Sequence, residues 1–189
     1  MWIVLGIVAA LVLGFQGHEA YATIKEDNSV DENWTIFDSL FKKFGQAYGV
    51  NPNYLKAICM NESSLGTDES VVIGIKTPLD IENSKSSDGK SWGIMQVTVT
   101  TGSDYDENCS PELLNNPSYS VDLAAQIFRD NMKRFSSSEP RYLELVVKSY
   151  NEGAGNAKKE LAGTGGGYAD EYWNRWQRNY QKIVTKGLL

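Results

Sequence analysis

The sequence predicts one α+β domain that is mostly α-helical, and three observations support this fold class. Apolar residues recur at three- and four-residue spacing in several segments, which is the pattern of helices with one buried face. The periodicity is absent between about residues 69 and 92, where the β-branched residues at 71–73 favour a small extended region. The chain has 189 residues, 41% of them hydrophobic, which is enough for one sizeable core but not for two.

Two helices are expected before the extended region. The first runs from an N-cap at Asp31 to about Tyr48. The second starts at Asn51-Pro52, because Asn caps a helix and Pro suits its first turn, and it ends near Gly66. The apolar stripe of the first helix consists of Trp34, Phe37, Leu40, Phe41, Phe44 and Tyr48.

The rest of the domain is expected to be a loop followed by further helices. Residues 83–91 are polar and contain glycine, which is typical of a loop, and residues 92–99 are expected to be a strand or a short helix. Two later helices are expected to start at Ser120 and Pro140. An aromatic helix closes the chain after a flexible link at 163–167, and no internal repeat or domain boundary is visible.

The N-terminal segment differs from the rest of the chain. Residues 2–15 are all apolar or glycine, a run shorter than the roughly 20 residues of a membrane-spanning helix but suited to a secretory signal peptide. A small-residue Ala-Tyr-Ala sequence ends at Ala22 and fits a cleavage site, although no Lys or Arg precedes the run. We expect a signal peptide or a retained membrane anchor at 1–22, a tether at 23–30 and the domain at 31–189. Either alternative places the domain outside the cytoplasm.

The composition excludes several classes of function. The chain has 18 Lys and Arg against 24 Asp and Glu, a net charge of −6, which argues against nucleic acid as a partner. Its one histidine, His18, falls in the leader. The domain therefore has no Ser-His or Cys-His nucleophile pair and lacks the histidines of the usual zinc hydrolase site. We expect neither a metal nor a cofactor, and chemistry that depends on carboxylates.

The two cysteines, Cys59 and Cys109, leave two alternatives. An even number of cysteines in an exported protein favours a disulfide. Buried free thiols are the other alternative, because Cys59 lies on the apolar face of its helix.

Glu62, near the end of the second helix, is the candidate catalytic residue. It follows Leu55, Ile58 and Cys59 by seven, four and three residues and therefore shares their apolar face. Desolvation on such a face raises the pKa of a carboxyl group, which is what a general acid needs near neutral pH. Taken alone, the position also fits a glutamate that reaches solvent at a helix end.

Three sequence blocks resemble the single-domain lytic transglycosylases, which are related to goose-type lysozyme. The block Ala57-Ile-Cys-Met-Asn-Glu-Ser63 is similar to the catalytic Glu-Ser at a helix end in that family. Gly93-Ile-Met-Gln-Val is similar to its Gly-Leu-Met-Gln segment, and Ser149-Tyr-Asn-Glu-Gly-Ala-Gly to its Ala-Tyr-Asn-x-Gly-x-Gly. The blocks come in the family's order within residues 31–184. The resemblance implies a lysozyme-like domain whose extended region lies between the catalytic helix and the Gly-Ile-Met-Gln block.

The resemblance also implies a reaction. The family cleaves the β-1,4 bond between N-acetylmuramic acid and N-acetylglucosamine in peptidoglycan. Glu62 would protonate the glycosidic oxygen and then, as a carboxylate, accept a proton from the 6-hydroxyl of the muramic acid residue. The N-acetyl group of the substrate would assist, so that a 1,6-anhydro sugar forms and no water is consumed.

A set of substrate-binding residues follows from the same resemblance. Met95 and Gln96 would line the cleft, and Tyr150 would direct its hydroxyl towards the catalytic glutamate or the N-acetyl group. Ser63 would hydrogen-bond near the reacting sugar, and Asn151 would bind substrate or hold the local turn. From the residues alone, Ser63 and Asn151 also fit capping and turn roles, and Tyr150 fits a core position.

Two other functions remain as alternatives. A goose-type lysozyme would hydrolyse the same bond with acidic residues that flank the Gly-Leu-Met-Gln block. Asp88 lies near the upstream position but Thr98 occupies the downstream one, and the missing second acid favours the transglycosylase. A non-catalytic glycan-binding module of a wall-crossing apparatus would keep the cleft without needing Glu62.

The biological setting has several alternatives. An envelope or periplasmic protein, free or anchored through residues 2–15, would act in wall turnover or with a secretion machine. A component of a phage virion is a further alternative, and it would explain why no positive side chain precedes the apolar run.

Overall fold

The computed structural model describes residues 34–73, 85–187 and 189. The expected leader at 1–22, the tether at 23–30 and the N-cap Asp31 lie outside the described residues. Within the described part of the chain, no helix is both long and apolar enough to cross a membrane.

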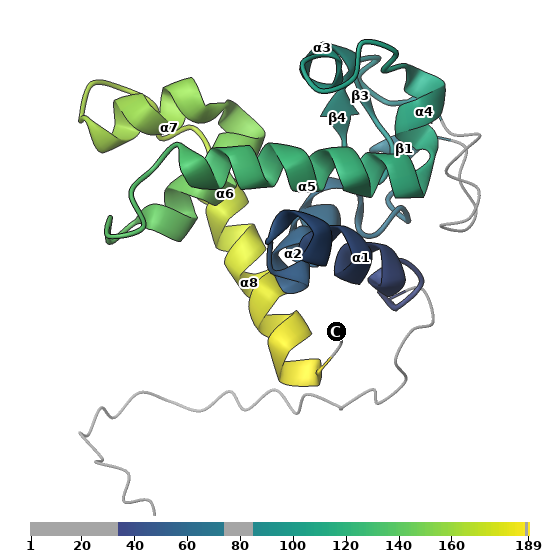
Figure 1. Cartoon of the computed structure of the whole chain (residues 1–189), viewed down its shortest axis with the longest axis horizontal. Helices are drawn as coiled ribbons and strands as arrows, with labels where there is room; N and C mark the ends of the chain where they lie inside the picture. Colours follow the sequence, from purple (N-terminus) through teal and green to yellow (C-terminus); the bar gives the residue numbers. More distant parts are fainter. Residues whose placement is uncertain (1–33, 74–84, 188) are drawn as a thin grey trace, which may run out of the picture. The chain divides into compact units, whose positions relative to one another are not determined.

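Helices dominate the described residues, and the strands are very short, as the predicted fold class requires (Figure 1). The strands are β1 (Val72–Ile73), β2 (Lys85–Ser86), β3 (Ser91–Trp92) and β4 (Val97–Thr98). The helices are α1 (Asp38–Tyr48), α2 (Pro52–Ser63), α3 (Val99–Ser103), α4 (Pro111–Asn115), α5 (Pro117–Lys133), α6 (Tyr142–Glu152), α7 (Ala154–Leu161) and α8 (Asp170–Lys186).

The boundaries of the first two helices agree only in part with the sequence. Helix α1 begins at Asp38, because residues 34–37 just before it form turns rather than α-helix, so the prediction that the helix already includes those residues is wrong. The predicted start of α2 is confirmed: the Asn51 side chain accepts a 2.9 Å hydrogen bond from the backbone of Asn53. Helix α2 ends at Ser63, three residues before the expected end, because Ser64 adopts a left-handed conformation with φ of 50°.

Strands β1, β2 and β3 lie where the extended region was predicted, between α2 and the Gly-Ile-Met-Gln block, and β4 directly follows that block. The described strands form two antiparallel pairs, β1 with β2 and β3 with β4. Residues 92–99, expected to be a strand or a short helix, contain parts of both: a β3–turn–β4 hairpin that leads directly into α3. Thr98 caps α3 by accepting a hydrogen bond from the backbone of Thr101.

The second half differs from the prediction at three points. Helix α5 begins at Pro117 with Asn116 as its cap, so the expected cap Ser120 lies inside the first turn, where it is fully buried. Helix α6 begins at Tyr142, two residues after the expected proline. Helix α7 was not predicted. Gly153, with φ of 80°, separates α6 from α7.

The core places α2 in contact with α1, α5 and α8. Lys56 of α2 is fully buried and pairs with Asp38 of α1 at 2.6 Å. On the α8 side, the indole of Trp176 donates a 3.4 Å hydrogen bond to the Tyr54 carbonyl. In Figure 1, α5 crosses the middle of the domain, with α3, α4 and the strands towards one end and α6 and α7 towards the other. These contacts hold α2, and with it Glu62, in a fixed position.

Candidate active site

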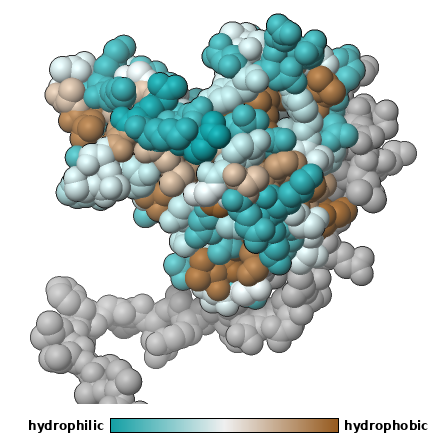
Figure 2. All heavy atoms as spheres, viewed as in Figure 1, coloured by the Kyte–Doolittle hydropathy of each residue, from teal (hydrophilic) through white to brown (hydrophobic). Residues whose placement is uncertain are grey.

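A cavity of about 470 Å³ contains Glu62 in its wall. In Figure 2 the surface is hollowed between the part that carries α3 and the part that carries α7. Polar side chains predominate in the lining, which suits a ligand recognised by hydrogen bonds. The lining residues are Glu62, Ser91, Gln96, Val97, Thr98, Thr101, Asp104, Tyr105, Ile127, Asn131, Arg134, Ser149, Tyr150, Asn151, Gly153, Ala154 and Gly155.

A larger hollow of about 760 Å³ lies along one face of α8, between Asn174 and Lys186. None of the residues that line it carries a carboxyl group, so it cannot supply the carboxylic acid that the sequence predicts for the catalytic site. We therefore assign the chemistry to the smaller cavity.

Glu62 is half-buried, and solvent reaches it through the cavity. The surrounding protein nevertheless removes most of the water from its carboxyl group, and this desolvation raises its pKa from 4.5 to about 7. The Tyr172 hydroxyl donates a 2.6 Å hydrogen bond to Oε1, and the positive charge of Arg175 acts on the same group; both effects oppose the rise. The pKa of Glu62 therefore suits both donating and accepting a proton near neutral pH.

Tyr172 is the partner of Glu62 that the sequence did not reveal. It lies on the aromatic helix that the sequence predicts at the end of the chain, and it is 5% exposed. Asn61 donates a 3.0 Å hydrogen bond to the Tyr172 carbonyl and accepts one of 2.7 Å from Asn179. Both contacts join the end of α2 to α8. One available signal was that a buried tyrosine needs a hydrogen-bond partner for its hydroxyl.

The Gly-Ile-Met-Gln block forms the tight turn between β3 and β4. Gly93 has φ of 71°, and a Cβ atom there would lie 1.9 Å from the Leu114 carbonyl oxygen, so only glycine fits. Gln96 also has a positive φ, 49°, and its side-chain amide donates a 2.8 Å hydrogen bond to the Gly93 carbonyl. Gln96 lines the cavity, as the cleft prediction requires.

Two residues expected in the cleft lie elsewhere. The Met95 side chain is fully buried in the core, and only its backbone takes part in the turn, so its expected position in the lining is wrong. Ser63 is 1% exposed and donates a 2.7 Å hydrogen bond to the Ile94 carbonyl. Ser63 also accepts one from the Gly66 backbone. Ser63 thus joins the end of α2 to the β3–β4 turn and does not line the cavity.

The third sequence block places two residues at the cavity. Tyr150 lines it, but its hydroxyl donates a 2.9 Å hydrogen bond to the Met95 carbonyl, so the expected contact with Glu62 is not observed. The other expected contact, with the N-acetyl group of the substrate, stays a prediction. The charge of Glu62 still acts on Tyr150, whose pKa is raised well above its ordinary value, mainly by burial and then by that charge. Asn151 is exposed and lines the same cavity.

Asp88 does not occupy the place expected of a second acid. It lies in the exposed loop between β2 and β3 and is absent from the cavity lining. Its carboxylate accepts hydrogen bonds from the backbone of Ser91, from the side chain of Ser86 and from the backbone of Lys90, and these hold its pKa well below the ordinary value. Asp88 therefore stabilises its own loop as a permanent anion. The carboxylate that does share the cavity with Glu62 is Asp104, just after α3, which the sequence did not single out.

Both cysteines are free and buried, so the structure shows the thiol alternative and not the disulfide. Cys59 donates a 3.4 Å hydrogen bond to the Ile94 carbonyl. Cys109 lies beside Gly102 of α3, where a Cβ atom would come within 2.3 Å of its sulfur. Each cysteine therefore fills a separate, closely packed position.

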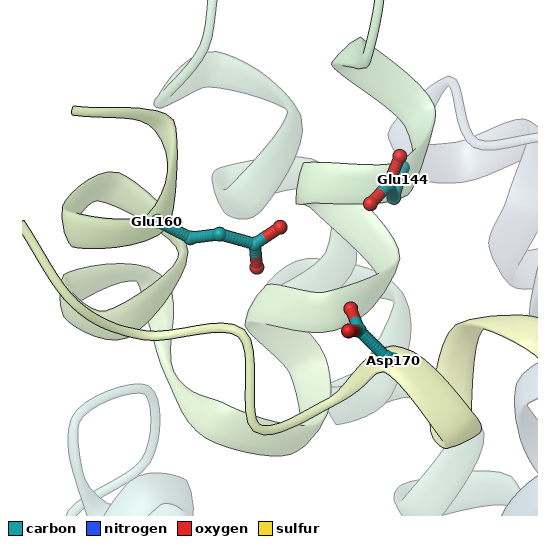
Figure 3. A group of neighbouring side chains, drawn as sticks. All are labelled: Glu144, Glu160 and Asp170. Atoms are coloured by element: carbon teal, nitrogen blue, oxygen red, sulfur yellow. The ribbon is translucent and has the colours of Figure 1, made fainter. Parts of the chain in front are cut away.

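The described residues also contain a cluster of three carboxylates, Glu144, Glu160 and Asp170, which point towards one another from α6, α7 and α8 (Figure 3). Lys148 supplies the positive charge for this cluster: its ammonium pairs with Glu144 and with Glu160 at 2.9 Å and also with Asp170. Burial disfavours the charged lysine, but these hydrogen bonds raise its pKa above the ordinary value. The cluster is therefore an ion network that joins three helices.

The comparisons with known proteins agree with this arrangement. The family model described as the transglycosylase SLT domain matches residues 39–173, well over half of the 189 residues. The match includes α2, the β3–β4 turn, the cavity lining and Tyr172. No curated protein sequence matches the chain. The chain belongs to the SLT transglycosylase domain family, a family of lysozyme-like, glycan-cleaving domains that act on peptidoglycan.

Proposed function

We propose that this protein is a peptidoglycan lytic transglycosylase in which Glu62 acts first as the general acid and then as the general base. The observation that carries the proposal is the environment of Glu62, a largely desolvated carboxyl group in the wall of a polar cavity with a pKa of about 7. Family membership supplies the substrate class, the β-1,4-linked glycan of peptidoglycan.

The first step is cleavage of the bond between N-acetylmuramic acid and N-acetylglucosamine. Protonated Glu62 gives its proton to the glycosidic oxygen, which is a poor leaving group until it is protonated. The bond from this oxygen to C1 of the muramic acid breaks, and the carbonyl oxygen of the substrate's own N-acetyl group supports the developing positive charge at C1. The side chain of Glu62 is left as a carboxylate.

The second step closes a ring within the same sugar. The 6-hydroxyl of the muramic acid attacks C1, and the Glu62 carboxylate accepts the hydroxyl proton. The product is a 1,6-anhydro-N-acetylmuramic acid end, and Glu62 is protonated again. No water enters the products. A pKa near 7 suits both half-reactions, because either protonation state is accessible at neutral pH.

Hydrolysis by a goose-type mechanism is the second candidate, and a specific residue favours it. Glycosidases that use water require a second carboxylate, several ångströms from the acid, to activate that water or stabilise the sugar cation. Asp88 is engaged within its own loop, but Asp104 lines the same cavity as Glu62. The hydrolytic alternative therefore rests on Asp104 in place of Asp88.

Other parts of the cavity support substrate binding. Gln96 and Asn151 both line it and offer amide groups to the glycan. Tyr172 holds the Glu62 carboxyl by its 2.6 Å hydrogen bond and so fixes its orientation. For a substrate in the cell wall we propose an extracytoplasmic location, reached through a signal peptide or an anchor at 1–22. We propose two wider settings for this protein, either alongside a secretion machine or within a virion.

Substitution of the acid tests the proposal. Glu62→Gln keeps the shape of the side chain but removes its acidic proton, so turnover of purified peptidoglycan is expected to fall by at least about a thousandfold. Release of soluble muropeptides measures the rate, and a circular dichroism melt checks the fold. Glu69→Gln, at an exposed glutamate outside the cavity, is the matched control and should cleave normally. If the protein is a non-catalytic binding module, neither the wild type nor any variant will show turnover. If Glu62→Gln turns over peptidoglycan as fast as the wild type, Glu62 is not the catalytic acid.

A further inference from the structure

One wall of the cavity carries polar groups that the proposed chemistry at Glu62 does not use. They come from the end of α5, where Asn131 lies within the last turn and Arg134 directly follows the helix. These two residues are three apart and therefore lie on the same side of the helix. Both line the cavity that contains Glu62.

Asn131 has a hydrogen-bond donor without a partner. Its side chain is 6% exposed, and its amide nitrogen Nδ2 is buried without an acceptor in the part of the chain that the structure describes. A buried N–H group left unpaired is unfavourable, because it has lost its hydrogen bonds to water without gaining another. Its place in the cavity lining makes a ligand the natural acceptor, and a neutral amide N–H suits a carbonyl or carboxylate oxygen.

Arg134 brings a positive charge to the same wall. Among the described residues that line the cavity it is the one cation, in a chain whose net charge is −6. Its guanidinium is exposed, takes part in none of the described ion pairs, and lies close enough to Tyr105 for its charge to act on that phenol. An unpaired guanidinium in a binding cavity is suited to a carboxylate, which it can bind through two parallel hydrogen bonds.

A plain chain of N-acetylhexosamines has carbonyl groups but no carboxylate. In peptidoglycan, the carboxylates are carried by the substituent on O3 of muramic acid, either as the free lactyl acid or within the peptide attached to it. We propose that Asn131 and Arg134 form a subsite for this O3 substituent, in which Asn131 donates to a carbonyl oxygen and Arg134 pairs with a carboxylate. The inference rests on the proposed function, because it takes peptidoglycan as the occupant of the cavity.

The subsite is tested with Arg134→Gln and three kinds of glycan strand. The first kind carries peptides, the second has been stripped by an amidase to expose the lactyl acid, and the third has its carboxylates coupled to ethanolamine as neutral amides. Arg134→Gln is expected to raise KM about fivefold on strands that carry the recognised carboxylate, with kcat unchanged. On neutralised strands the variant and the wild type should have equal KM values. If Arg134→Gln raises KM on the stripped strands, the carboxylate that Arg134 binds is the lactyl acid. If the variant raises KM only on the peptide-bearing strands, that carboxylate belongs to the peptide.

Lys133→Gln is the matched control, since it removes the same charge one residue away. Lys133 pairs with Asp130 and does not line the cavity, so its KM values should match the wild type on every substrate. The subsite is ruled out if Arg134→Gln leaves KM unchanged on all strands, raises it equally on neutralised ones, or behaves as Lys133→Gln does. A melting curve excludes misfolding, and Arg134→Lys should recover part of the affinity.

Failure of the subsite and failure of the proposed function give different results. If the wild type cleaves no strand, the proposed function is wrong, and the subsite is then judged by binding alone. Calorimetric titration of Glu62→Gln and of the double variant with Arg134→Gln measures strand affinity without turnover. A fivefold weaker affinity of the double variant for carboxylate-bearing strands supports the subsite, and equal affinities overturn it.

Discussion

At the scale of single residues, the site depends on a carboxyl group under two opposing influences. Desolvation of Glu62 favours the neutral acid, whereas the hydrogen bond from Tyr172 and the charge of Arg175 favour the carboxylate. Desolvation is the larger effect, so the pKa rises to about 7. A group with this pKa donates its proton below neutral pH and loses its activity as an acid above it.

Substitution Tyr172→Phe should therefore change the pH dependence of cleavage in a defined direction. The Tyr172 hydroxyl lowers the pKa of Glu62, so its loss raises that pKa further. Because the free enzyme must be protonated at Glu62, the alkaline limb of kcat/KM should move to higher pH, by about half a unit or more. The rate of muropeptide release between pH 5 and 9 measures this limb.

Tyr168→Phe provides the matched control for that experiment. Its side chain is 80% exposed, and it precedes α8 by two residues. It should leave the pH profile unchanged. A shift of the alkaline limb to lower pH in Tyr172→Phe, or none at all, would contradict the assigned role of the Tyr172 hydroxyl.

The sequence predicts single residues well where local spacing decides their position. Glu62 follows from the helical register and from the motif around it. Its contact with Tyr172 does not, because the two residues are 110 positions apart and meet only through packing of α8 on α2. Met95 illustrates a second limit: a motif assigns a residue to a site without stating whether its side chain or its backbone is used.

At the scale of elements, the position of α8 controls the site. Helix α8 carries Tyr172, and its first residue, Asp170, belongs to the ion network around Lys148 (Figure 3). Lys148 has 1% of its side chain exposed and joins α6, α7 and α8 through its three carboxylate partners. Arg141 adds ion pairs with Glu144 and Glu160. The network therefore joins α8 to α6 and α7, whose connecting turn lines the cavity.

Lys148→Met should destabilise the domain. The methionine fills a similar space but leaves Glu144, Glu160 and Asp170 close together without the buried cation. Because these carboxylates are partly exposed, we expect a loss of about 2 kcal/mol in the free energy of unfolding, less than for a fully buried pair. Urea unfolding measures the loss. Lys159→Met, at an exposed lysine of α7, should cost less than about 0.5 kcal/mol. Equal stabilities of the two variants would show that the network does not join the helices.

The sequence predicted the type of an element, helix or strand, more often than its first and last residues. The Asn51 cap and the following proline define the start of α2 because both act within one turn. The start of α1 was misplaced because apolar spacing extends into the turns before Asp38, and spacing alone does not distinguish a turn from a helix. Helix α7 has few apolar residues, and Ala157 is the one that it buries, so it gave little periodic signal.

At the scale of the whole molecule, the small extended region and the helices enclose one polar cavity. The β3–β4 turn and α3 supply one side, and the end of α5 with the α6–α7 turn supplies the other. The sequence predicted the family and the order of the three blocks, and the family match confirms the transglycosylase domain. It did not predict Asp104, Asn131 and Arg134 in the lining, because the packing of α3 and α5 brings them there and no motif marks them.

The products of peptidoglycan digestion test the central claim most directly. The wild-type protein, incubated with purified glycan strands, is followed by mass spectrometry of the released muropeptides. If Glu62 acts alone as acid and then base, the products end in 1,6-anhydro-N-acetylmuramic acid and carry no added water. Products that end in reducing N-acetylmuramic acid, each heavier by one water and lost in Asp104→Asn, would contradict the account and establish hydrolysis with Asp104 as the second carboxylate.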